Sequence, residues 1–168
     1  MIKILDFNKE LQNDTKSFVI ENMNRELDIK DKNAFLTITK DLDNIEENYI
    51  NKGGRFLIAY DYSERRIVGT IAFTFENGMA ILKRFYVSEK VRKQRIGFLL
   101  YKTLEEIIKI NNIKNIYLVS GKELECAQAF YKKNGWKETL DNPGLFVRKG
   151  AVLYQKEIKE DLWMIIKY

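Results

Sequence analysis

The chain has 168 residues, of which 45% are hydrophobic and 32% charged, and its formal net charge is +5 at pH 7. This size and balance exclude a disordered or collagen-like chain and predict one domain over residues 1–168. No apolar run reaches the ~18 residues of a membrane span, and the first apolar run is too short for a signal peptide. We therefore expect a cytoplasmic protein without a membrane partner.

Histidine is absent from the sequence, and Cys126 is the single cysteine. A Ser/His/Asp triad, a Cys/His dyad and a zinc cluster are therefore excluded, and we expect no metal. Cys126 has no second cysteine for a disulfide and no histidine to activate it, so we interpret it as a small helix residue. Any chemistry must rest on Tyr, Glu, Asp, Lys or the backbone.

The first fifty residues predict a strand followed by two helices. The strand covers residues 2–7, the first helix residues 10–27 and the second helix residues 42–50. Two consecutive glycines at 53–54 end this part of the chain.

Three short apolar runs then predict antiparallel strands. Residues 56–60 and 67–75 are rich in β-favouring side chains and are separated by a polar turn at 61–66. The dipeptide Asn77-Gly78 precedes a third run at 79–82 and predicts a hairpin, because both residues tolerate positive φ.

The centre of the chain predicts a helix, a strand and a second helix. The first helix begins near Arg95 and ends at Asn111-Asn112. Its apolar residues recur at helical spacing and are Ile96, Leu99, Leu100, Leu104, Ile107 and Ile108. A strand at 115–120 and a helix at 124–134, which Gly135 terminates, follow it. A strand, a helix and a strand in this order suggest a right-handed parallel crossover.

The last thirty residues predict a turn and two closing strands. Asn142-Pro143-Gly144 marks the turn, and the apolar runs at 151–154 and 162–166 predict the strands. An apolar strand near the C-terminus could pair with a second copy of the chain, so a homodimer is one expectation.

Basic residues concentrate where the central helix begins. Six fall within thirteen positions, namely Lys83, Arg84, Lys90, Arg92, Lys93 and Arg95. Each cation near a helix N-terminus costs roughly 0.3–1 kcal/mol, whereas a bound anion would reverse the sign of the effect. Gly97 would let such an anion approach the backbone. On charge alone, an anion site and a solvated basic turn are equally good interpretations.

Two motifs in this region resemble those of one enzyme family. Arg92-x-x-Arg95-x-Gly97, directly after a strand, resembles the R-x-x-G-x-G/A signature of the GNAT superfamily of N-acetyltransferases, and residues 127–136 resemble its A-x-x-[LF]-Y-x-x-x-G-[FW] segment. The resemblance implies an α/β (α+β) acyl-CoA N-acyltransferase-like fold, in which about four helices flank a mixed, mostly antiparallel sheet of six to seven strands. It also implies acetyl-CoA as the cosubstrate.

The same resemblance implies a cofactor site. Backbone groups of the strand would pair with the pantetheine amides, N–H groups from Gln94 through Phe98 would wrap the pyrophosphate, and the cations of the loop would supply charge. The implied residues are Phe85, Tyr86, Val87, Arg92, Lys93, Gln94, Arg95, Ile96, Gly97 and Phe98.

Tyr131 is the implied catalytic residue, which would donate a proton or a hydrogen bond to the departing thiolate. An aromatic residue on a helix is otherwise usually a core residue, and the motif reverses that preference only modestly. A tyrosine near pKa ~10 that protonates a thiolate near ~8.5 works uphill by about 2 kcal/mol, which is tolerable.

Three departures from the family pattern limit what can be carried over. Arg95 replaces the first motif glycine, Leu124 stands where many members have asparagine, and Ile81 stands where many have a glutamate that serves as general base. That base is therefore unassigned. Glu46 and Glu47 are candidates only, because acidic side chains on a solvated helix face are commoner.

The sequence as a whole predicts an N-acetyltransferase that moves an acetyl group from acetyl-CoA to a primary amine of a small-molecule or peptide acceptor. We expect direct attack in a ternary complex, with positioning as the main contribution. One alternative is a non-catalytic acyl-CoA sensor, which the absence of the glutamate keeps open. The other is a basic nucleic-acid or ribosome-associated module, which leaves the second motif unexplained.

The acceptor itself is not identified by the sequence. Four acidic residues at the start of the predicted helix at 42–50 could attract a cationic amine, but they equally suit a helix start, and we favour that interpretation. They are Asp41, Asp43, Glu46 and Glu47.

Overall fold

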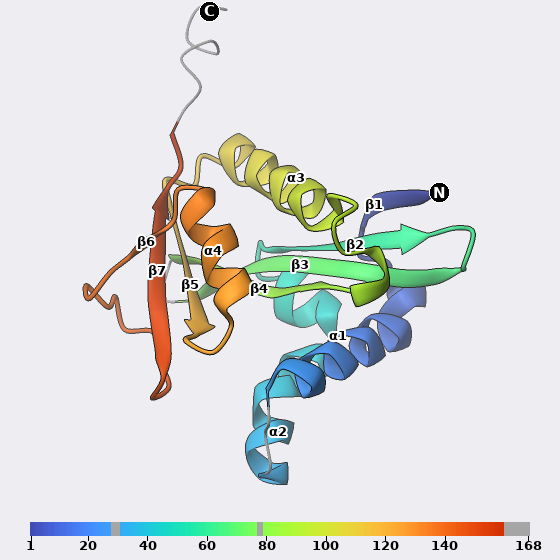
Figure 1. The fold of residues 1–168 in the computed structure, drawn as a ribbon, viewed down its shortest axis with the longest axis horizontal. Coiled ribbons are helices and arrows are strands. Elements are labelled where there is room, and N and C mark those ends of the chain that lie inside the picture. Colours follow the sequence, from blue (N-terminus) through green and yellow to red (C-terminus); the bar gives the residue numbers. More distant parts are fainter. Residues whose placement is uncertain (28–30, 77–78, 160–168) are drawn as a thin grey trace, which may run out of the picture. The chain divides into compact units, whose positions relative to one another are not determined.

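The computed structural model describes residues 1–27, 31–76 and 79–159. Within them the strands form a seven-stranded sheet in the order β1-β2-β3-β4-β5-β7-β6 (Figure 1). Their bounds are β1 Ile2–Asp6, β2 Arg55–Asp61, β3 Arg66–Glu76, β4 Met79–Val87, β5 Asn115–Gly121, β6 Lys137–Glu138 and β7 Ala151–Glu157. The helices are α1 Gln12–Glu26, α2 Lys32–Thr39, α3 Ile96–Ile110 and α4 Glu125–Lys133.

The sheet is mixed, as the sequence predicted. β1 with β2, β2 with β3, β5 with β7 and β6 with β7 are antiparallel pairs. The pairing of β4 with β5 is parallel, with Ala80 opposite Ile116 and Ile81 opposite Tyr117. Because parallel neighbours need a crossover connection, the predicted strand-helix-strand unit of β4, α3 and β5 is confirmed. The α/β fold class is confirmed with it.

The chain packs into two compact units. The first comprises residues 1–75 and 82–104, and the second comprises residues 76–81 and 105–168. The expectation of one domain over the whole chain stays a prediction.

The first unit has a core between α1, the segment 42–49 and the strands β2 and β3. Its buried members are Val19, Leu42, Ile45, Tyr49, Phe56, Ile58, Ile67 and Ala72. In Figure 1, α1 and α2 lie on one side of strands β2 to β4, and the start of α3 lies on the other side. The two faces of β4 in this unit therefore meet different helices.

The second unit has a smaller core around the beginning of β4. Ile81, Leu145 and Leu153 are buried there, and Met79, Tyr117 and Val147 pack against them. Burial among apolar side chains suits the aliphatic Ile81, because a carboxyl group would be costly to bury there without a partner.

The predicted helix at 42–50 was wrong in its bounds. A 3-10 turn covers Lys40–Asp43 and a π-helical turn covers Glu46–Ile50, whereas the regular helix is α2, which comes earlier. Asp31 caps α2, because its Oδ1 accepts hydrogen bonds from the N–H groups of Asn33 at 2.8 Å and Ala34 at 3.3 Å. Leu36 and Ile38 of α2 are largely exposed, so the helix has no core-facing stripe that periodicity could detect.

The strand at 151–154 is confirmed as part of β7, and the short strand β6 was not predicted. Asn112 and Gly135 have φ of 57° and 84°, as helix-terminating residues do. The predicted Asn77-Gly78 turn and the predicted strand at 162–166 lie outside the described residues. No helix among the described residues is both long and apolar enough to cross a bilayer.

Candidate active site

Side chains at the end of β4 point to opposite faces of the sheet and contact different parts of the chain. A Cβ atom added to Gly97 at the start of α3 would lie 3.3 Å from Val87 Cγ2 and 3.6 Å from Phe85 Cζ, so these side chains point toward α3. The side chain of Arg84 points to the other face, where it contacts Asp41. Phe85 and Val87 lie beyond the two positions at which β4 pairs with β5. Their side chains are packing residues, which is compatible with a backbone role in binding.

A short turn leads from β4 to α3. The Ser88 N–H donates to the Val68 carbonyl at 2.9 Å, and the Val91 N–H donates to the Ser88 carbonyl at 3.1 Å. Val91 is buried and fixes this turn to the first unit. The basic residues that follow therefore start from a defined position.

The basic loop has an irregular backbone before α3 begins. Lys93 and Arg95 both lie in the left-handed region, with φ of 64° and 63°. The helical ladder of α3 begins where the Leu99 N–H donates to the Arg95 carbonyl at 2.9 Å, so the N–H groups of the three preceding residues come before the first helical bond. Left-handed residues next to free helix-start N–H groups form a concave cradle for anions.

One of the N–H groups predicted to bind the pyrophosphate has a hydrogen-bond partner within the loop. The Gln94 N–H donates to the Val91 carbonyl at 3.3 Å and is therefore used inside the loop. Ile96, Gly97 and Phe98 supply the N–H groups at the helix start.

Arg95 occupies the position at which the motif usually has glycine. Its positive φ gives a reason for glycine at this position, because glycine adopts such a backbone without strain. A non-glycine residue in the left-handed region costs about 1–2 kcal/mol, which glycine avoids. The guanidinium carbon of Arg95 lies 5.6 Å from the ring centroid of Phe98, which is a cation–π arrangement. The chain thus keeps a strained backbone and gains a cation beside the cradle.

Arg92 is held by two carboxylates. Its Nη2 lies 3.3 Å from Glu26 Oε1 and its Nη1 lies 3.6 Å from Glu89 Oε1. Partial burial raises the pKa of Glu26, and the nearby guanidinium groups of Arg92 and Arg25 oppose that shift. Sequence reasoning did not find Glu26, because it lies 66 residues before Arg92.

A buried polar network lies on the other face of β4. Arg84 Nε donates to Asp41 Oδ2 at 3.1 Å, Tyr49 donates its hydroxyl to the same oxygen, and Arg84 also donates to the Ile38 carbonyl. Burial raises the pKa of Tyr49 and of Tyr86. Burial by itself would lower the pKa of Arg84, but Tyr49 and Asp41 beside it raise the pKa overall. The preferred interpretation of Asp41 as a helix-start residue was therefore incomplete.

Because of this network, the basic residues that are close in sequence do not all lie on the surface. The side chain of Arg84 is only 12% exposed and is committed to Asp41, whereas Arg92 is 48% exposed. The six cations therefore do not form one continuous surface of the kind that tracks a nucleic-acid backbone.

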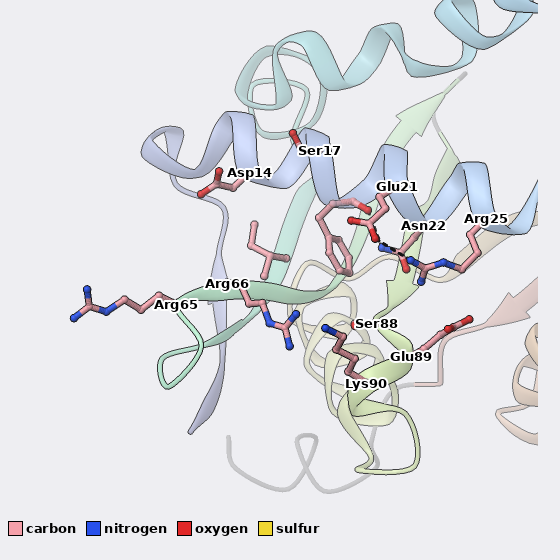
Figure 2. Close-up of a pocket in the computed structure, with 12 residues that line it drawn as sticks. Asp14, Ser17, Glu21, Asn22, Arg25, Arg65, Arg66, Ser88, Glu89 and Lys90 are labelled. Carbon is pink, nitrogen blue, oxygen red and sulfur yellow. Dashed lines mark hydrogen bonds and ion pairs between the residues drawn. The ribbon is translucent and has the colours of Figure 1, made fainter.

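A separate cavity of about 420 Å³ lies in the first unit beside α1. Figure 2 shows that α1 lines it on one side, and that Arg65, Arg66 and the turn containing Ser88 line it on the other. Its charges are mixed, and one pair, Arg25 with Glu21, is joined at 2.8 Å. The predicted cofactor residues are not among its lining residues.

Tyr131 lies in the second unit, on α4, and is 7% exposed. Its ring centroid is 5.9 Å from that of Trp136 and 5.9 Å from that of Tyr154. This aromatic cluster holds the ring in one orientation.

The other acidic and thiol candidates are surface residues. Glu46 lies 3.5 Å from Lys9, and Glu47 accepts a hydrogen bond from Asn51 at 2.8 Å. Both suit the solvated helix face that we favoured for them. Cys126 is exposed.

Comparison with known proteins identifies the family. The sequence profile described as "Acetyltransferase (GNAT) domain" matches residues 52–138, which is more than half of the chain. This chain belongs to the GNAT acetyltransferase family. The resemblance of the two motifs is thereby confirmed. No curated protein matches the chain.

Solved structures of acetyltransferases are similar to this chain in fold. A GNAT-family acetyltransferase from Staphylococcus aureus MU50 is 32% identical, with a TM-score of 0.82 over 95% of this chain and 100% of its own. An acetyltransferase from Streptococcus agalactiae 2603 is 24% identical, with a TM-score of 0.78 over 93% and 98%. The PaiA N-acetyltransferase from Thermoplasma acidophilum, solved in complex with coenzyme A, is 20% identical, with a TM-score of 0.73 over 94% and 99%. An acyltransferase activity and coenzyme A binding follow from membership of this family.

Proposed function

We propose that this protein transfers an acetyl group from acetyl-CoA to a primary amine of a small-molecule or peptide acceptor. The observation that supports the proposal most strongly is the loop from Arg92 to Phe98, which combines left-handed backbone at Lys93 and Arg95, the N–H groups of a helix start and three cationic residues. Such a cradle suits a diphosphate better than a single carboxylate, because it offers several donors and several charges.

The residues have distinct parts in this proposal. The backbone of Phe85 and Val87 binds the pantetheine amides, while Lys93, Arg92 and Arg95 neutralise the pyrophosphate. The amine attacks the thioester carbonyl directly, and Tyr131 donates to the leaving thiolate. Holding both substrates in contact supplies most of the rate enhancement.

The loss of a proton from the amine remains the costly step. A lysine-like amine of pKa ~10.4 must be deprotonated at a cost of about 4.6 kcal/mol at neutral pH. Ile81 cannot supply a base, because its side chain is aliphatic and buried in the second core. The proposed enzyme therefore takes up amines that are already deprotonated or uses a carboxylate from elsewhere.

The first test is calorimetric titration with acetyl-CoA of the wild type and of the Arg92→Ala/Arg95→Ala variant, at low and moderate salt. We expect micromolar binding by the wild type and a loss of at least tenfold in the variant. Thiol release with a panel of primary amines then tests transfer. A folded wild type that does not bind acetyl-CoA would overturn the proposal. Binding without turnover of any amine would support the acyl-CoA sensor instead.

A further inference from the structure

Arg92 of the basic loop is tied to the last residue of α1. Its Nη2 lies 3.3 Å from Glu26 Oε1, and the Glu26 side chain is 29% exposed. This is a long-range contact between a helix end and the loop, unlike the local contact of Arg92 with Glu89 three residues before it. The guanidinium that should meet the pyrophosphate therefore already has a carboxylate partner.

The groups that face Glu26 leave Arg92 as its main cationic partner. Arg25 also faces Glu26, but its guanidinium is paired with Glu21 at 2.8 Å, as Figure 2 shows. Among the residues that the structure describes, Glu89 and Tyr86 are the other titratable groups that interact electrostatically with this carboxylate. If Arg92 turns away, the charged groups that remain near Glu26 in the described part of the chain are the shared Arg25 and the acidic Glu89.

We propose that Glu26 competes with the cofactor pyrophosphate for Arg92, holding the guanidinium in the empty protein and releasing it when the diphosphate binds. The inference rests on the proposed function. A carboxylate and a diphosphate are alternative partners for the same guanidinium, because both use its paired N–H groups. Cofactor binding must therefore break the Glu26–Arg92 pair or share Arg92 between two anions.

The competition predicts how the affinity for the cofactor changes with pH. Glu26 near a bound diphosphate faces an additional anion and a lost cation, so its pKa rises further when the cofactor binds. Because the bound state then holds more protons, affinity for the cofactor increases as pH falls from neutrality toward the ordinary glutamate value of 4.5. The terminal phosphate of coenzyme A also titrates near pH ~6, but equally for every variant.

The test is calorimetric titration with coenzyme A of wild type, Glu26→Gln and Glu21→Gln from pH 7.5 to 5.5. Glu21→Gln is the matched control, because it removes the same charge from the same helix but from the partner of Arg25. We expect Glu26→Gln to bind coenzyme A about two- to fivefold more tightly at pH 7.5, and to show a weaker pH dependence than either other protein. Thermal melts check that the three proteins are equally folded.

The Arg92→Ala background isolates the contact. There the additional Glu26→Gln change should alter the affinity by less than about 1.5-fold, because no guanidinium remains to be released. Equal affinities and equal pH dependence for wild type and Glu26→Gln would overturn the competition while leaving the proposed function intact. Failure of the wild type to bind coenzyme A at all would overturn the proposed function itself.

Discussion

The guanidinium of Arg84 and the carboxylate of Asp41 lie 43 residues apart in sequence and are joined by two hydrogen bonds. Arg84 also has a φ of 54°, a left-handed conformation inside a strand, and its carbonyl accepts the hydroxyl of Thr70 at 2.8 Å. The pair ties the segment after α2 to β4, next to the backbone that we propose for pantetheine. An irregular strand residue is thereby held in place by side-chain contacts on one face of the sheet.

We predict that Asp41→Asn lowers the free energy of unfolding by about 2–3 kcal/mol. The variant leaves the mostly buried guanidinium of Arg84 without a charged partner. Because the side chain of Asp41 is a quarter exposed, the expected cost is below the 3–5 kcal/mol of fully buried pairs. Urea unfolding measures the change. Asp43→Asn is the control, because Asp43 pairs with Lys16 at the surface, and it should cost less than about 1 kcal/mol. Equal effects of the two variants would contradict a structural role for the pair.

The left-handed backbone of Arg95 predicts an inverted ranking of glycine and alanine. At an ordinary helical or extended position glycine is the less stable residue by roughly 0.5–1 kcal/mol, whereas at positive φ alanine is strained. Arg95→Gly should therefore unfold at a higher urea concentration than Arg95→Ala. The free energy of unfolding of the glycine variant should be higher by about 0.5–1 kcal/mol. Both variants lose the same charge, so they should weaken acetyl-CoA binding to a similar degree. A more stable alanine variant would show that the loop does not keep this conformation in solution.

Gly97 is expected to tolerate one methyl group but not a branched side chain. An added Cβ would lie 3.3 Å from Val87 Cγ2, a tight contact that the helix propensity of alanine offsets. Gly97→Ala should change stability by less than about 1 kcal/mol, whereas Gly97→Val should cost about 1–3 kcal/mol through overpacking. We expect Gly97→Val also to weaken acetyl-CoA binding, because the overpacking acts on β4. Adding Val87→Ala to Gly97→Val should restore part of both losses, and no restoration would place the damage elsewhere.

Tyr131→Phe should separate the catalytic and packing roles of this residue. The ring contacts with Trp136 and Tyr154 are kept, so the variant tests the hydroxyl group alone, and a thermal melt measures what that group contributes to stability. If the hydroxyl protonates the leaving thiolate, kcat should fall by about 10²–10⁴ while the affinity for acetyl-CoA is unchanged. The comparison requires an amine that the wild type acetylates. A kcat within twofold of the wild type would leave Tyr131 as a core residue, the role that its burial alone suggests.

The sequence by itself determined the elements whose signal is local. The strands β2, β3 and β5 and the helices α3 and α4 follow from apolar spacing and from terminating residues such as Asn112 and Gly135. Cations placed at a helix start, where local energetics disfavour them, predicted either an anion site or a solvated turn, and only the motif resemblance favoured the anion site that we propose. These features depend on residues a few positions apart, which a linear pattern contains.

Only the tertiary structure decided what the charged residues of the loop and of β4 contact. Arg84 and Arg92 look alike in sequence, yet one is buried against Asp41 and the other is held by Glu26 at the end of α1. The partners lie 43 and 66 residues away, and a salt bridge leaves no periodic trace in either segment. Packing of α1 and of the segment after α2 on the sheet brings these groups together, so burial and pairing were set by the fold and not by local spacing.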